Sequence, residues 1–158
     1  MMKIAWLVDV GYVTQASRGR GKIDYLKTKT FLEHRYNAPC EALIFNGVDR
    51  KYGIDLGLKQ FYHTMEKSGF VVKLYEMEGG VQKQVDVAIA THFIYYALKG
   101  YTVILSSGDR DFVPAVQLAT AEAGKVVLLT YNFGVHPELA GLAGEVIHFE
   151  DFPQVLRT

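Results

Sequence analysis

The amino-acid sequence predicts an α/β protein built on a central parallel sheet. Short apolar runs alternate with helix-length segments along all 158 residues, which is typical of such a sheet. Most of these runs are continuously apolar, as strands covered by helices on both faces are. Gly69, Gly100 and Gly124 follow helical segments at the position where a left-handed residue ends a helix. We expect one domain over residues 1–158.

Six strands are expected from the apolar runs. The first contains the run IAWLVD and ends at Asp9, and the last is short. A continuously apolar run of this length is a buried strand when turn or helix residues bound it. The predicted strands cover residues 3–9, 41–46, 70–75, 102–106, 125–130 and 146–149.

Four helices are expected between these strands, over residues 25–36, 54–68, 85–98 and 112–123. The segment 14–22 is expected to be a loop, and it contains the basic run RGRGK. The chain shows no internal repeat, low-complexity stretch or linker. Strands that alternate with helices in this way form parallel βαβ units.

Charge and cysteine content restrict the function only loosely. Seventeen basic and seventeen acidic residues cancel, so a nucleic-acid partner would need a local patch. Residues 15–36 supply one, with six basic and two acidic side chains. Cys40 is the only cysteine, which excludes an internal disulfide and favours the reducing cytoplasm. The apolar run before Asp9 is too short for a signal peptide or a membrane span.

Three candidate carboxylates follow predicted strands. Asp9 ends the first strand, and Asp109 and Asp111 lie directly after the fourth. In open parallel sheets, ligands bind beyond the carboxyl ends of the strands, where the strand order reverses. A fourth carboxylate, Asp86, lies on a helical stripe that is otherwise apolar. A charged group on such a stripe indicates a specific role.

Neighbouring carboxylates repel one another, and a divalent cation relieves that repulsion. Oxygen ligands favour Mg²⁺ or Mn²⁺, an arrangement that activates water for phosphodiester hydrolysis. The same four aspartates have an alternative interpretation in which three of them only cap helices. Asp109 and Asp111 would then only cap the helix at Phe112, and Asp86 its own helix, because aspartate is favoured at helix N-termini.

Three runs resemble successive blocks of the NYN domain family, the LabA-like branch of the PIN-like nucleases. They are KQVDVAIA at residues 83–90, ILSSGDRDFVP at residues 104–114 and GKVV at residues 124–127. With Val8 and Asp9 near the N-terminus, the resemblance covers about residues 3–150. The Ser-Gly-Asp-x-Asp-Phe block is its most specific part.

The resemblance implies a PIN-like fold, a three-layer α/β/α sandwich with a central parallel sheet of strand order 3-2-1-4-5. Strands one and four are neighbours in that order, which brings the three strand-end carboxylates together, with Asp86 reaching in from the side. The resemblance also implies metal-dependent cleavage of RNA with Mg²⁺ or Mn²⁺. The catalytic and metal-binding residues would be Asp9, Asp86, Asp109 and Asp111.

Two positions depart from the family pattern. Family members usually have an asparagine where this chain has Tyr12, and often an aspartate where it has His92. Tyr12 either stacks an incoming base or fills the site of a chain that no longer cleaves RNA. His92 lies six residues beyond Asp86, on the other side of that helix, so we leave it out of the site.

The basic run leaves the same end of the sheet as Asp9. It would either close over a single RNA strand and contact phosphates, or remain a solvated loop. Lys83, three residues before Asp86, has the same two interpretations. The candidate substrate-binding residues are Tyr12, Arg18, Arg20, Lys22, Lys83, Ser107 and Arg110.

Other chemistries lack their motifs. The sequence has no Gly-x-Gly-x-x-Gly turn between a strand and a helix, no Walker-type Gly-Lys-Ser/Thr and no Gly-x-Ser-x-Gly elbow. Three functions remain: a metal-dependent ribonuclease, a catalytically degenerate NYN module that binds RNA or a protein partner, and a metal-dependent phosphohydrolase of small nucleotides. RNA is the expected partner, no membrane is expected, and the sequence is compatible with a homodimer.

Overall fold

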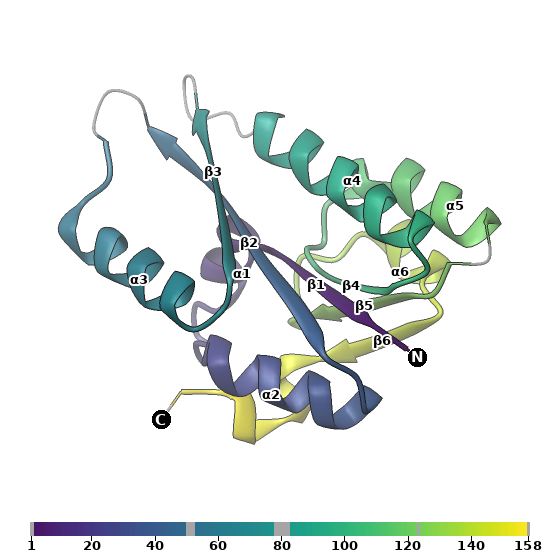
Figure 1. The fold of residues 1–158 in the computed structure, drawn as a ribbon, viewed down its shortest axis with the longest axis horizontal. Coiled ribbons are helices and arrows are strands. Elements are labelled where there is room, and N and C mark those ends of the chain that lie inside the picture. The colour runs from purple at the N-terminus through teal and green to yellow at the C-terminus, as the bar shows by residue number, and fades with distance from the viewer. Residues whose placement is uncertain (1, 50–52, 78–82, 123, 158) are drawn as a thin grey trace.

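Six strands pair in one parallel sheet with the order β3-β2-β1-β4-β5-β6 (Figure 1). The computed structural model describes residues 2–49, 53–77, 83–122 and 124–157. The order 3-2-1-4-5 is confirmed, and the sixth strand lies beside β5. The strands are β1 Ile4–Asp9, β2 Cys40–Asp49, β3 Val71–Met77, β4 Thr102–Ser106, β5 Val126–Thr130 and β6 Glu145–His148.

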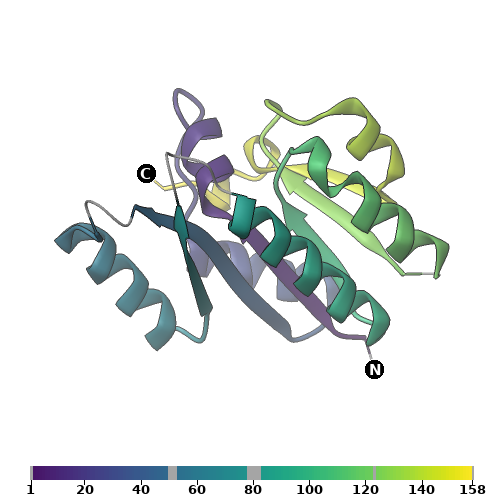
Figure 2. The ribbon, with the colours of Figure 1, turned by 90° about the horizontal axis from the view of Figure 1, so that it is seen from above.

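Helices cover both faces of this sheet, which confirms the three-layer α/β/α architecture. Helices α4 and α5 lie in front of the sheet in Figure 2, and α2 lies behind it. The helices are α1 Val10–Ala16, α2 Tyr25–Tyr36, α3 Leu56–Lys67, α4 Lys83–Leu98, α5 Val113–Ala121 and α6 Pro137–Leu142, with 3₁₀ turns at Arg110–Phe112, Phe149–Asp151 and Pro153–Val155.

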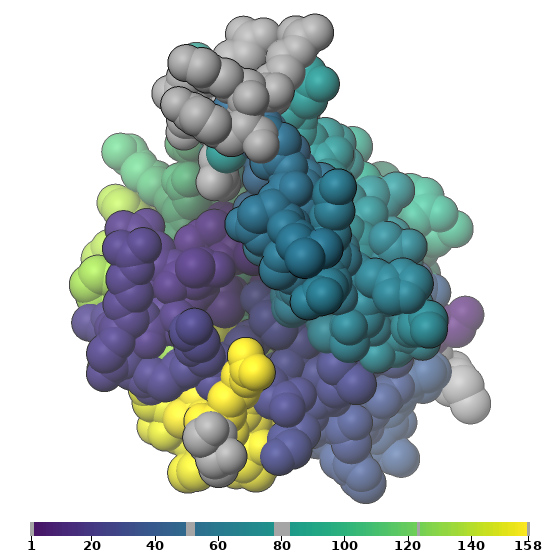
Figure 3. Space-filling view, turned by 90° about the vertical axis from the view of Figure 1, so that its left-hand side faces the viewer, coloured from purple at the N-terminus to yellow at the C-terminus, as the bar shows by residue number. Residues whose placement is uncertain are grey.

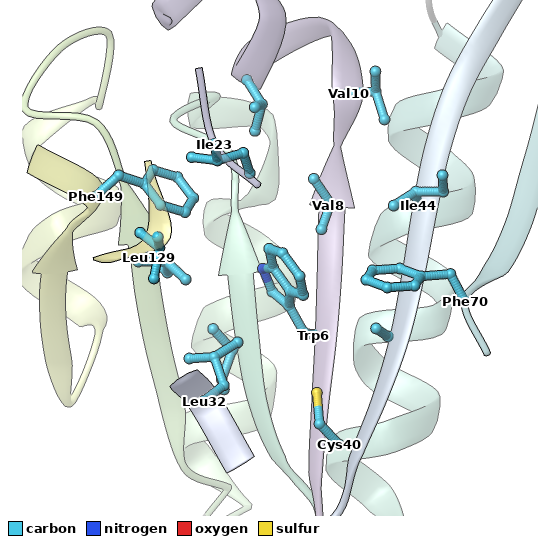
Figure 4. Close-up of a cluster of buried hydrophobic side chains, with 14 of the residues drawn as sticks. Trp6, Val8, Val10, Ile23, Leu32, Cys40, Ile44, Phe70, Leu129 and Phe149 are labelled. Atoms are coloured by element: carbon cyan, nitrogen blue, oxygen red, sulfur yellow. The ribbon is translucent and has the colours of Figure 1, made fainter. Parts of the chain in front are cut away.

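The alternation of side chains along β1 divides the interior into two cores. Trp6 and Val8 face α2 and α3, whereas Ala5 and Leu7 face α4 and α5. Trp6 is fully buried and donates a hydrogen bond from Nε1 to Ser106 Oγ at 2.9 Å. Figure 4 shows Trp6 between Leu129 on one side and Phe70 on the other. This bond links β1 to β4 next to the edge where the candidate site lies.

Two short helices were missed by the sequence analysis, α1 and α6. Segment 14–22 was expected to be a loop, but α1 extends through Ala16. With seven and six residues, these helices are too short to show a helical period. The end of the predicted helix 112–123 falls at a residue outside the described part, and α5 ends at Ala121.

In the described part of the chain, no helix combines the length and the apolar character needed to cross a membrane.

Candidate metal centre

Asp9 reaches the site because of the period of a β-strand. It is the last residue of β1 and alternates with Leu7, so its side chain lies on the face covered by α4. It is 6% exposed, and both of its carboxylate oxygens accept hydrogen bonds. Oδ1 accepts from the backbone N–H of Tyr12 at 3.2 Å, and Oδ2 accepts from Ser107 Oγ at 3.0 Å. Asp9 therefore caps α1 and is fixed in place.

Three of the four predicted ligands converge. Asp86 lies in the first turn of α4, and Asp109 and Asp111 flank the start of the 3₁₀ turn after β4. Each offers one carboxylate oxygen, and these oxygens lie within 4.8 Å of one another. Asp9 is not part of this group, although its charge acts on Asp86 and is acted on by Asp109.

Helix capping accounts for only part of this arrangement. Asp109 accepts a hydrogen bond from the backbone N–H of Asp111 at 2.8 Å and caps the 3₁₀ turn. Helix α5 has no side-chain cap. Within the described residues, the carboxylates of Asp86 and Asp111 accept no hydrogen bond. Capping therefore leaves two of the three carboxylates unexplained.

Burial and charge repulsion raise the pKa of Asp86. Burial is the larger cause, and together with the charges of Asp109, Asp9 and Asp111 it raises this pKa to about 6. Burial also raises the pKa of Asp9. Among the described residues, no lysine, arginine or histidine forms an ion pair with Asp86, Asp109 or Asp111. The cluster therefore has no counter-charge among the described residues.

The donor set fits a hard divalent cation. Carboxylate oxygens are the ligands that Mg²⁺ and Mn²⁺ prefer. Opposite oxygens around Mg²⁺ lie about 4.2 Å apart, twice the usual Mg–O distance. The three oxygens lie within 4.8 Å of one another, so small side-chain rotations or a bridging water would bring them into ligand positions around one ion. Asp86, Asp109 and Asp111 are thus the residues able to hold the ion.

Ser107 holds Asp9 in place through a hydrogen bond in the interior. It was expected to bind substrate, and the structure places it in the interior, fully buried, with its hydroxyl donating to Asp9. Arg110 is 70% exposed and forms an ion pair with Glu138 of α6, with 3.5 Å between Nε and Oε2. The sequence analysis did not anticipate this ion pair, because it missed α6, which carries Glu138.

Tyr12 connects α1 to the loop after β5. Its hydroxyl donates to Phe133 O at 2.8 Å and accepts from Tyr131 N at 3.1 Å. Burial raises the pKa of Tyr12 to about 12. Neither the base-stacking nor the site-filling interpretation included this bond, by which Tyr12 joins α1 to the loop after β5.

Gly108 allows the same loop to approach the carboxylates. A Cβ at Gly108 would lie 2.0 Å from Gly134 O, which is a backbone atom. The backbone N–H of His136 donates to Gly108 O at 3.0 Å. The glycine of the Ser-Gly-Asp block is therefore required by a contact that only the folded chain shows.

The basic run lies on the surface beside α1. Arg18 and Lys22 are exposed, and Arg20 is half-buried. Lys22 lines a groove of about 570 Å³ whose walls include α1 and α3, and Figure 3 shows this side with α1 in purple, α3 in blue and the C-terminal residues in yellow. Lys83 is exposed at the first residue of α4.

His92 lies outside the site, as expected. Its Nδ1 lies 2.7 Å from Ala88 O within α4, and its ring packs edge-on against Phe45. The ring is therefore part of the packing between α4 and the sheet.

Comparisons with known proteins agree with this fold. The NYN domain family matches the chain over residues 3–150. A crystal structure of a protein of unknown function from Vibrio parahaemolyticus has a TM-score of 0.82 and 26% sequence identity, with 99% of this chain and 96% of that chain covered. No curated protein is similar enough to count as a match.

Proposed function

This chain belongs to the NYN domain family, and from that premise we propose that it is a metal-dependent ribonuclease that hydrolyses phosphodiester bonds in RNA. The observation that supports the proposal most strongly is the cluster of Asp86, Asp109 and Asp111. Their oxygens lie within 4.8 Å of one another, without a counter-charge among the described residues. A ribonuclease needs such a site because its substrate brings a further negative charge to the reacting centre.

Asp86, Asp109 and Asp111 would hold Mg²⁺ or Mn²⁺. When bound, the ion polarises the scissile phosphate and lowers the pKa of an attacking water. The chain fixes the ligands in advance: the N–H of Asp111 orients Asp109, and α4 presents Asp86 in its first turn. Asp9, held by Ser107, adds negative charge behind the ligands and increases their affinity for the cation.

Exposed cations would guide the RNA backbone toward this centre. Arg18 and Lys22 follow α1, and Lys83 lies at the start of α4, one turn before Asp86. Phosphate contacts of this kind release counterions, so RNA affinity should fall as the salt concentration rises.

The test is incubation of the protein with labelled single-stranded RNA, single-stranded DNA and a panel of nucleotides, with Mn²⁺ or with EDTA. We expect Mn²⁺-dependent cleavage of RNA that Asp86→Asn abolishes. Asp55→Asn is the matched control, because Asp55 caps α3 away from the cluster and asparagine caps helices equally well. Hydrolysis of nucleotides alone would assign a phosphohydrolase instead, and equal RNA cleavage by Asp86→Asn and the parent would refute the proposal.

One observation favours a second candidate, an NYN module that binds RNA without cleaving it. Tyr12 stands where the family usually has asparagine, and its hydroxyl is engaged by the backbone at Tyr131 and Phe133. This candidate predicts RNA binding by the parent without cleavage in Mn²⁺. It also predicts cleavage by Tyr12→Asn, which restores an oxygen ligand next to Asp9.

A further inference from the structure

Phe133 is an aromatic residue on the surface, in a loop that touches the residue before Asp109. Its side chain is 46% exposed, in the loop between β5 and α6. The next residue, Gly134, touches Gly108, and Gly108 immediately precedes Asp109. Phe133 is therefore an exposed aromatic residue on a loop that contacts the turn bearing Asp109.

The loop that carries Phe133 is fixed at three points. Tyr12 donates to the carbonyl of Phe133 at 2.8 Å. The N–H of Asn132 donates to a carboxylate oxygen of Glu150 at 2.9 Å, and the N–H of His136 donates to Gly108 O at 3.0 Å. The ring is therefore held by a rigid support, so a ligand that stacks on it loses little entropy in ordering the protein.

Arg20 stacks on the ring of Phe133. Its guanidinium carbon lies 3.9 Å from the ring centroid, a close cation–π contact. Arg20 Nη1 also donates to Ala16 O at 3.2 Å, at the C-terminal end of α1. The guanidinium is thereby oriented by α1, and it brings positive charge to the aromatic surface.

We propose that Phe133 and Arg20 form a stacking platform for a base of single-stranded RNA beside the metal centre. The platform rests on the proposed function, because it positions the strand that Asp86, Asp109 and Asp111 would cleave. The base lies on the exposed aromatic surface, and the guanidinium attracts the adjacent phosphate. Every base has a π-face, so the platform accepts any sequence.

Charge and location favour RNA over a protein segment as the occupant. Arg20 Nη1 also donates to the carbonyl of exposed Arg18 at 3.3 Å, and the loop that carries Phe133 touches Gly108, the residue before Asp109. A single RNA strand has flat bases, which can stack on the ring, and phosphates, which the arginines attract. Proteins that bind single strands combine aromatic stacking with basic grooves in the same way.

The experiment measures the affinity of an RNA oligonucleotide in EDTA, so that no cleavage occurs, for the parent, Phe133→Ala and Phe133→Trp. Phe133→Ala should weaken binding about 5- to 150-fold, the equivalent of about 1–3 kcal/mol for one stacked base. Phe133→Trp should keep the parent affinity. Tyr95→Ala is the matched control, because Tyr95 is 50% exposed on α4 and has Lys99 Nζ 4.5 Å from its ring centroid.

A second oligonucleotide of the same length, with abasic sugars throughout, keeps the phosphates but has no bases. It therefore distinguishes base stacking from contacts with the backbone. The parent should bind it more weakly than normal RNA, and Phe133→Ala should cause no further loss. An equal loss on both oligonucleotides would show that Phe133 acts through the fold and would overturn the platform. The unfolding midpoint in urea verifies that each variant is folded.

The outcomes separate the platform from the nuclease. If the parent cleaves RNA and Phe133→Ala binds as the parent does, the platform is wrong and the nuclease stands. If the parent binds RNA in a Phe133-dependent way without cleaving it in Mn²⁺, the platform stands and the nuclease is wrong. If the parent does not bind RNA, both are wrong.

Discussion

The surroundings of Asp86 favour the protonated form of its carboxyl group. Its pKa is raised from 3.8 to about 6 by burial and by three neighbouring aspartates. A raised carboxyl pKa means that the folded state binds the proton more tightly than the unfolded state does. Without metal, the ionised group therefore destabilises the fold, and this effect develops as the pH rises from about 4 to about 6.

The test compares the unfolding temperatures of the parent and Asp86→Asn in EDTA across this pH range. The difference should be small near pH 4, because both side chains are then neutral. Above pH 6 the variant should unfold at the higher temperature. Titrating groups outside the four aspartates are common to both proteins and cancel. A difference that does not change with pH would show that the pKa of Asp86 is not raised in the folded state.

Tyr12 has a structural role that is separate from the metal. Tyr12→Phe removes the hydroxyl that joins α1 to Phe133 O and Tyr131 N. Because two backbone groups lose a partner at a partly buried site, we expect a loss of about 1–2 kcal/mol in the free energy of unfolding. Urea denaturation measures it. Tyr101→Phe is the control, since its hydroxyl donates to exposed Glu41 and its loss should be nearly neutral.

The sequence identified the carboxylates but not the contacts between them. Asp86, Asp109 and Asp111 stood out because strand ends and an apolar helical stripe are local features of the sequence. The hydrogen bond from Tyr12 to Phe133 did not, because 121 residues separate the two partners. A tertiary hydrogen bond leaves no periodic pattern in the sequence, so these roles could only come from the fold.

Among the elements, those with buried faces were predicted best. Helix α2 and strand β4 have the predicted bounds, and β1 differs by one residue. Strand β2 extends three residues beyond the prediction to Asp49, because its last residues are only half-buried and carry no apolar signal. Helix α1 is held by the capping of Asp9 and by packing, rather than by a periodic sequence.

The turn between β4 and α5 depends on the absence of a side chain at Gly108. Gly108→Ala would place a Cβ 2.0 Å from Gly134 O and 2.8 Å from Val135 Cα, so one of the two backbones must move. We expect a loss of about 1–3 kcal/mol in stability, and a fall in Mn²⁺ affinity because Asp109 follows directly. Thermal unfolding and Mn²⁺ titration measure the two effects.

Gly141→Ala provides the comparison for this prediction. Gly141 lies in α6, and a Cβ there would meet no atom within 4 Å. Alanine in a helix is favoured over glycine by about 0.5–1 kcal/mol, so this variant should be as stable as the parent or more so. If both alanine variants behaved alike, the contact between Gly108 and Gly134 would not determine the position of the carboxylates.

At the scale of the whole molecule, the candidate centre joins α4 to the turn between β4 and α5, two parts of the chain that also pack together on one face of the sheet. Asp86 comes from α4, while Asp109 and Asp111 come from the turn between β4 and α5. A cation bound by all three connects these helices at their N-terminal ends. The unfolded chain does not keep these oxygens within 4.8 Å of one another, so the ion binds the folded state preferentially.

Mn²⁺ should therefore raise the unfolding temperature in a saturable way. At 100 times the dissociation constant, the stabilisation is about 2.7 kcal/mol, and a domain of this size gains about 2–4 °C per kcal/mol. We expect a rise of about 5–11 °C in calorimetry or thermal-shift measurements. Asp109→Asn should remove most of the rise while keeping the cap, because asparagine also caps helices. An equal rise in that variant, or the same rise with Na⁺ at matched ionic strength, would mean that Mn²⁺ acts elsewhere on the surface.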